Sequence, residues 1–180
     1  MMSRHMYPSL LLLVVLLWAA DATAKGTIRR FAVLAGANNG GPGRVALRYA
    51  QSDARALARV LYQLGGVRRG DLQLMLEPSR AVLIKRLTAL RGKLASARKA
   101  GGRLELLFYY SGHSDDRGLL LGKERLTYSQ LRQALKDLST DVTIAVLDSC
   151  ASGAMTRGKG GRRRPPFLSD RSTNVRGHAY

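Results

Sequence analysis

The stretch DVTIAVLDSCASGAM, residues 141–155, decides which fold the sequence predicts. Its apolar part, residues 142–147, is short and continuous, as is typical of a strand buried on both faces of a sheet. The stretch leads into Asp148 and then Cys150, which is the only cysteine among the 180 residues. Small residues follow the cysteine at once, so a substrate backbone would have room beside the sulfur.

The rest of the chain alternates between strand-like and helix-like segments. Apolar residues spaced three and four apart mark the helices, and glycine pairs end two of them. A small hairpin is expected between the last two helices. The predicted strands cover residues 30–36, 71–77, 103–110 and 142–147, the helices 46–64, 79–99 and 129–138, and the hairpin 118–128. This order predicts an α/β fold, a three-layer αβα sandwich with a mostly parallel central sheet flanked by helices.

Two chemically active side chains follow strands of this predicted sheet. His113 comes three residues after the end of the strand at 103–110, and Cys150 three residues after the end of the strand at 142–147. Ligands of open α/β sheets bind outside the carboxyl ends of the strands. If the two strands are neighbours, an imidazole lies beside a thiol, and the imidazole can take or balance the thiol proton. The backbone N–H groups of Ser114 and Cys150 could then hold a tetrahedral oxyanion.

Simpler interpretations of both residues stay open. A lone cysteine after an apolar strand is often a small core residue. A lone histidine in a Gly/Ser turn is often a hydrogen-bonding loop residue. A zinc site is not expected, because one cysteine and one histidine without closely spaced partners do not form a ligand set. We therefore predict no metal site.

The N-terminus predicts export. Arg4 precedes an unbroken apolar run at residues 10–20, and Ala22-Thr23-Ala24 provides a small-x-small cleavage site. We expect residues 1–24 to be a signal peptide and residues 25–180 to form one domain of a secreted or periplasmic protein. A membrane anchor is the alternative, although the run is shorter than the ~20 residues of a spanning helix.

The charge of the chain predicts attraction to polyanions. Thirty basic and twelve acidic residues give a net charge of +18. A polyanion-binding protein is therefore an alternative function. Specific nucleic-acid recognition is not expected, because only 6% of the residues are aromatic and could stack on bases. A single cysteine excludes an intramolecular disulfide.

The motifs SGHS around His113 and DSCASG around Cys150, on successive strands of an α/β domain, resemble the caspase-like cysteine peptidases over about residues 29–180. Asp53 and Ala54, in YAQSDARALARVLYQLGG, are similar to the first helix of that family. The resemblance implies a caspase-like fold and an endopeptidase with a Cys-His dyad. Cys150 would be the nucleophile and His113 the general acid/base. Protein or peptide is the implied partner, without nucleic acid, membrane or cofactor, and a calcium requirement stays open.

The resemblance also implies a substrate preference. In metacaspase-like members, the aspartates that match Asp53 and Asp148 line a pocket for a basic side chain, and Ser111 could add a polar contact. Two carboxylates would favour Arg or Lys by charge pairing. Asp53 could instead be an ordinary helix-start residue and Asp148 a turn or cap. Ser114 replaces the glycine that usually follows the histidine, so an inactive interaction module with this fold is an alternative.

The segment after the cysteine carries two further expectations. Arg162, Arg163 and Arg164 lie in a Gly/Pro-rich loop, where an enzyme with basic preference could process itself. A solvated run of charge is the alternative, and an intact mass that stays unchanged on incubation of an active protein would exclude self-cleavage. The final residues, 174–180, resemble the start of the family's next strand, and the domain is expected to be incomplete at the C-terminus.

Overall fold

The structure is a computed structural model that describes residues 27–149 and 177–179. The predicted signal peptide at residues 1–24 lies outside these residues, so its cleavage stays a prediction. Within the described part of the chain, no helix is long and apolar enough to cross a membrane.

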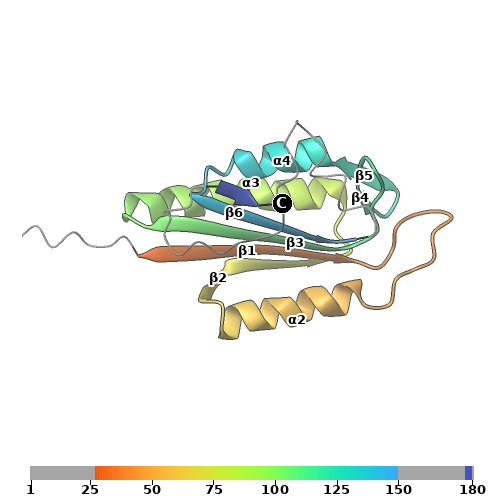
Figure 1. Cartoon of the computed structure of the whole chain (residues 1–180), viewed down its shortest axis with the longest axis horizontal. Helices are drawn as coiled ribbons and strands as arrows, with labels where there is room; N and C mark the ends of the chain where they lie inside the picture. The colour runs from red at the N-terminus through yellow and green to blue at the C-terminus, as the bar shows by residue number, and fades with distance from the viewer. Residues whose placement is uncertain (1–26, 150–176, 180) are drawn as a thin grey trace, which may run out of the picture.

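The described residues form one main sheet, three helices and a hairpin (Figure 1). The strands of the sheet lie in the order β2-β1-β3-β6-β7, and every neighbouring pair is parallel. A separate antiparallel hairpin, β4-β5, follows β3. The elements are β1 Ile28–Ala37, α2 Ala50–Gln63, β2 Val67–Leu76, α3 Arg80–Lys99, β3 Arg103–Gly112, β4 Gly118–Leu121, β5 Glu124–Thr127, α4 Tyr128–Lys136, β6 Val142–Asp148 and β7 Gly177–Ala179.

Helices cover both faces of the sheet. Helix α2 lies on one face, while α3 and α4 lie on the other (Figure 1). Strand β1 shows why, because Phe31 and Val33 pack with α3 and α4, whereas Ala32 and Leu34 pack toward α2. Consecutive residues of a strand point to opposite faces, so a strand buried on both faces is apolar throughout. The three-layer αβα sandwich predicted from the sequence is confirmed.

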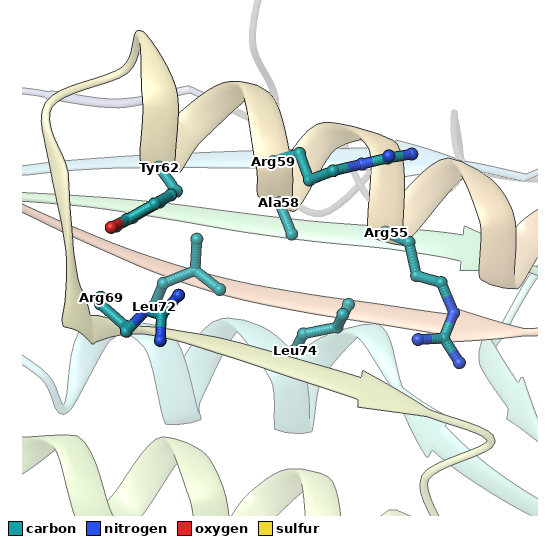
Figure 2. Close-up of a pocket in the computed structure, with 7 residues that line it drawn as sticks. All are labelled: Arg55, Ala58, Arg59, Tyr62, Arg69, Leu72 and Leu74. Atoms are coloured by element: carbon teal, nitrogen blue, oxygen red, sulfur yellow. The ribbon is translucent and has the colours of Figure 1, made fainter.

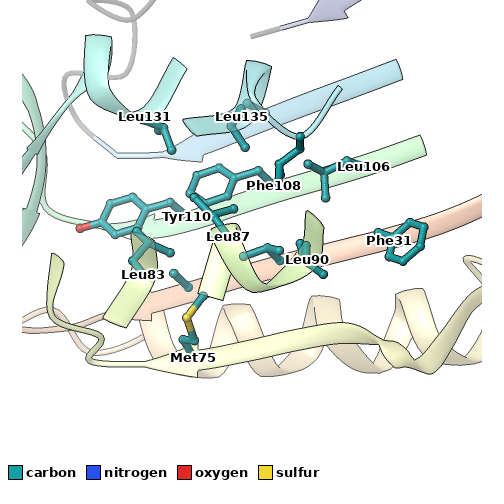
Figure 3. Packing of buried hydrophobic residues seen from close by; sticks show 14 of the residues in the cluster. Phe31, Met75, Leu83, Leu87, Leu90, Leu106, Phe108, Tyr110, Leu131 and Leu135 are labelled. Atoms are coloured by element: carbon teal, nitrogen blue, oxygen red, sulfur yellow. The ribbon is translucent and has the colours of Figure 1, made fainter. Parts of the chain in front are cut away.

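The larger core lies between the sheet and helices α3 and α4. Figure 3 shows Leu83, Leu87 and Leu90 of α3 directed at aromatic side chains of the sheet, including Phe108 and Tyr110. The three leucines and both aromatic rings are at most 1% exposed. Leucines at this helical spacing form one face, which explains how α3 is held against the sheet.

The ends of the helices follow local signals, with one exception. Ser79 caps α3 by accepting a hydrogen bond from Val82 N at 3.2 Å, as its sequence position predicted. The predicted helix over residues 46–64 was too long at its start, since α2 begins at Ala50. Residues before Ala50 belong to a loop because Leu47 N donates to Asn38 O at 2.8 Å, which fastens this segment to the end of β1.

Asp141 joins β3 to the start of β6. Its Oδ2 accepts from Leu104 N at 2.7 Å, and Arg98 Nη1 donates to its Oδ1 at 3.3 Å. The hydrogen bond from Leu104 N, assisted by Arg98, lowers the pKa of Asp141 below its usual value against an opposing contribution from burial. The charged carboxylate is therefore favoured in the folded state.

We expect Asp141→Asn to lower the free energy of unfolding by about 1 kcal/mol at neutral pH. Because the folded-state pKa is below the unfolded one, the contribution is present above the unfolded pKa and is lost as pH falls through the folded pKa. The difference between variant and parent should therefore shrink below about pH 4. Urea unfolding at neutral pH and below about pH 4 measures this difference in the free energy of unfolding. Asp116→Asn, which changes an exposed carboxylate, is the control. A difference that does not change with pH would refute this role of the charge.

Candidate active site

His113 lies at the carboxyl edge of the sheet, one residue after the end of β3. Its Nε2 lies 3.0 Å from the carbonyl oxygen of Val45, in the loop between β1 and α2. A carbonyl can only accept, so this contact requires a hydrogen on Nε2. In the neutral ring, Nδ1 then carries the lone pair and is the atom that can take up a proton.

The loop between β1 and α2 also packs against the imidazole ring. A Cβ atom built on Gly40 would lie 2.4 Å from both Cγ and Cδ2 of His113. Real Cβ atoms do not approach other atoms so closely, so only glycine allows this contact. Gly40 and Val45 together fix the position of the ring.

Glu77 anchors this loop from the end of β2. Its carboxylate accepts hydrogen bonds from Asn38 N at 2.7 Å and from Gln51 Nε2 at 2.8 Å. The Oδ1 of Asn38 in turn accepts from Gln51 N at 3.1 Å, at the start of α2. These bonds tie together the ends of β1, β2 and α2. Glu77 was not predicted from the sequence, where its only signal was an acidic residue at the end of an apolar strand.

Tyr110 fixes the backbone of His113 from inside the core. Its hydroxyl lies 2.8 Å from His113 O and 2.9 Å from Leu120 O, in the first strand of the hairpin. Burial raises the pKa of Tyr110, so the hydroxyl stays protonated and can donate. The histidine is therefore held on both sides, at its ring by the loop and at its backbone by this tyrosine.

The segments that follow β3 and β6 lie side by side. The strands are hydrogen-bonded neighbours in parallel, with Ser111 opposite Asp148. Beyond the strands, Ser114 Oγ donates to Ser149 Oγ at 2.8 Å. The residue after His113 therefore contacts the residue before Cys150. The two strands are therefore neighbours, which was the condition for the dyad. Cys150 itself lies outside the described residues, and its contact with His113 stays a prediction.

The backbone of Ser114 is oriented by the hairpin. Ser114 forms an isolated antiparallel bridge with Leu119, in which Leu120 N donates to His113 O at 2.9 Å and Asp115 N donates to Gly118 O at 3.0 Å. In this arrangement the bridged residue itself makes no hydrogen bond across the pair. Strand β4 therefore does not engage the N–H of Ser114, and the role of this group as an oxyanion donor stays a prediction.

Of the predicted substrate-binding residues, Asp148 and Ser111 lie opposite each other at the ends of β6 and β3, while Asp53 is in the first turn of α2. Tyr109 Oη donates to Asp148 Oδ2 at 3.3 Å, and Ser111 is buried two residues further along β3. Burial is the main cause that raises the pKa of Tyr109, and the charges of Asp148 and of Asp53, in the first turn of α2, raise it further. Both carboxylates therefore act on one hydroxyl. Sequence analysis missed Tyr109, although it shares a strand face with Ser111.

Comparison with known protein families identifies the family of this chain. The caspase domain family matches residues 29–176, which include both motifs and the sheet from the second residue of β1 to the end of β6. The chain belongs to the caspase domain family. This is a family of cysteine peptidases, as the resemblance implied. The comparison with curated proteins gives no match.

Other predicted features of this caspase domain lie where the structure gives no test. Cys150 with its N–H group, and Arg162, Arg163 and Arg164, fall outside the described residues.

Among residues 27–149, no three His, Cys, Asp or Glu side chains are grouped so that they could hold a metal ion. The C-terminal strand expected within residues 174–180 is present as β7, parallel to β6.

Proposed function

We propose that this caspase domain is an exported cysteine endopeptidase that cleaves after Arg or Lys with a Cys150–His113 dyad. The hydrogen bond between Ser114 and Ser149 is the observation that carries the proposal, because it joins the two segments from which the dyad residues emerge. The contact of His113 Nε2 with Val45 O supports it, since it leaves Nδ1 for proton transfer. Protein or peptide is the substrate class.

The proposed dyad would cleave a peptide bond in two stages. His113 Nδ1 first takes the proton of the Cys150 thiol. The thiolate then attacks the scissile carbonyl carbon, and the new C–S bond leaves a negative oxygen that the N–H groups of Ser114 and Cys150 stabilise. His113 Nδ1 gives a proton to the amine as the C–N bond breaks, which leaves an acyl-enzyme. A water molecule then loses a proton to His113 and attacks the acyl carbon. The C–S bond breaks, and the carboxyl product leaves.

The preference for Arg or Lys rests on Asp53 and Asp148. Both charges act on the Tyr109 hydroxyl, so a guanidinium or ammonium placed beside Tyr109 would be attracted by both. The side chain of Asp148 is already positioned by its hydrogen bond with Tyr109. A carboxylate substrate residue would be repelled at the same place.

Fluorogenic peptides that end in Arg, Lys or Asp test this preference. With protein expressed from residue 1, we expect turnover after Arg and Lys. The double variant Asp53→Asn/Asp148→Asn should lower kcat/KM for the Arg peptide by about 10- to 100-fold, since charge-assisted hydrogen bonds are lost. Asp116→Asn is the matched control. Turnover after Asp would keep the peptidase and discard the basic pocket.

An inactive interaction module is the second candidate. Ser114 favours this module, because most members of the family have glycine at this position. The hydroxyl of Ser114 also donates a hydrogen bond to Ser149, the residue before Cys150. Such a module would hold a peptide at the same edge without cleaving it. Folded protein that turns over none of the three peptides, and that still binds the Arg peptide, would support the module and contradict the peptidase.

A further inference from the structure

A recess lies between helix α2 and strand β2, apart from the candidate active site. It is a groove of about 490 Å³, a size typical of ligand sites in proteins. In the sheet, β1 and β3 separate β2 from β6, so the groove is at the opposite edge from the cysteine segment. Figure 2 shows the side chains that line it, which are Arg55, Ala58, Arg59, Tyr62, Arg69, Leu72 and Leu74.

The groove combines an apolar floor with a basic rim. The four lining residues of α2 follow the spacing i, i+3, i+4 and i+7, so they form one stripe of the helix. Leu72 and Leu74 are two residues apart on β2 and are partly buried against the smaller core under α2. Figure 2 shows these leucines opposite Ala58, with the arginine side chains at the margins. The guanidinium of Arg69 lies 5.5 Å from the ring centre of Tyr62, which closes one end.

Among the described residues, the arginines of this rim have no acidic partners. Within residues 27–149, no ion pair involves Arg55, Arg59 or Arg69. Arginines on the adjacent strand differ, since Arg29 pairs with Asp71 at 2.9 Å and Arg30 pairs with Glu105 at 3.0 Å. Guanidinium groups bind carboxylates in pairs of parallel hydrogen bonds. The rim is therefore complementary to a ligand that carries carboxylates.

Strand β2 adds a backbone contribution. In the described sheet it pairs only with β1, and its other side is an edge. An edge strand presents N–H and C=O groups with which an extended peptide can pair. A peptide in this position would direct every second side chain to the α2 side. Those side chains would enter the groove above Leu72 and Leu74.

We propose that this groove binds an acidic peptide strand, which adds to β2, places alternate apolar side chains against Leu72 and Leu74, and pairs carboxylates with Arg55 and Arg59. Positive charge argues against two other occupants of the groove, which are a segment of this chain and a second copy of the protein. Residues 150–176 are rich in Arg and Lys and hold one acidic residue, Asp170, and a second copy would bring the same charge of +18. The site is a docking surface and does not depend on the proposed peptidase activity.

Fluorescence anisotropy with a synthetic peptide tests the proposal. The probe alternates leucine and threonine and ends in two glutamates. The protein is expressed from residue 1 with Cys150→Ala, so that cleavage cannot interfere. We expect the added double change Arg55→Gln/Arg59→Gln to weaken binding by about tenfold or more. Arg86→Gln, an exposed arginine of α3 on the other face, is the matched control and should leave binding unchanged.

Two further probes separate the parts of the proposal. A peptide with N-methylated amides cannot pair with the strand edge, so we expect it to bind much more weakly. Equal binding of this peptide would overturn strand addition, and an equal loss in Arg86→Gln would overturn the role of the groove. If dodecanoic acid binds with dependence on Arg55 and Arg59 while the peptide does not bind, the site takes a lipid and the proposal is wrong.

Discussion

Replacing His113 with alanine is expected to lower kcat/KM for an Arg-ending peptide by about 10³-fold or more, because general acid/base catalysis contributes typically 10²–10⁴-fold. The loss should fall mainly on kcat, since the imidazole moves protons in the transition state and does not hold the substrate. His113 lies after the end of β3 and is only partly buried, so the variant should keep its fold. Initial rates together with thermal unfolding measure both effects.

His113→Gln is the informative partner of this variant. A glutamine amide can still donate to Val45 O in place of Nε2, but it cannot take up a proton. We expect it to be as inactive as the alanine variant. Substantial activity in the glutamine variant would show that His113 only positions the loop, which contradicts its role as the acid/base.

Gly40→Ala is expected to lower kcat by about 10- to 100-fold, since a displacement of about 1 Å at a catalytic group can cost 10²-fold. The new methyl group would lie 2.4 Å from Cγ and Cδ2 of His113, so either the ring or the loop must move. Either movement breaks the contact between Nε2 and Val45 O. KM should change little, because Gly40 is not among the predicted substrate-binding residues.

Gly92→Ala is the control for Gly40→Ala. Gly92 lies within α3, and a Cβ atom there would meet nothing within 4 Å. This change should leave kcat unchanged and raise the free energy of unfolding by up to about 1 kcal/mol, because alanine favours a helix. If Gly40→Ala also left kcat unchanged, the loop would not determine the position of the imidazole.

Much of the fold could be predicted because its signals are local. Alternating apolar strands and amphipathic helices indicated the αβα sandwich, and the cap at Ser79 located the start of α3. The predicted position of His113 at a carboxyl edge needed only the length of β3 and the rule for open sheets. The adjacency of β3 and β6 then brought Ser111 opposite Asp148.

The contacts that hold the loop over the imidazole could not be predicted, because they join residues that are distant in the sequence. Glu77 holds the loop at Asn38, and Val45 contacts His113 across 68 residues. The same contacts explain the error at the start of α2, where apolar spacing suggested a helix from residue 46. Tertiary hydrogen bonds keep that segment in a loop over the imidazole, which a periodic pattern cannot reveal.

If His113 activates Cys150, the thiol should be alkylated at an increased rate. Because Cys150 is the only cysteine, iodoacetamide reports on this sulfur alone. An unperturbed thiol has a pKa of about 8.5, so it is slow to react near neutral pH. We predict that Cys150 reacts faster than free cysteine at neutral pH and that His113→Ala slows it to the rate of the free thiol. Equal rates for the parent protein, His113→Ala and free cysteine would contradict the dyad.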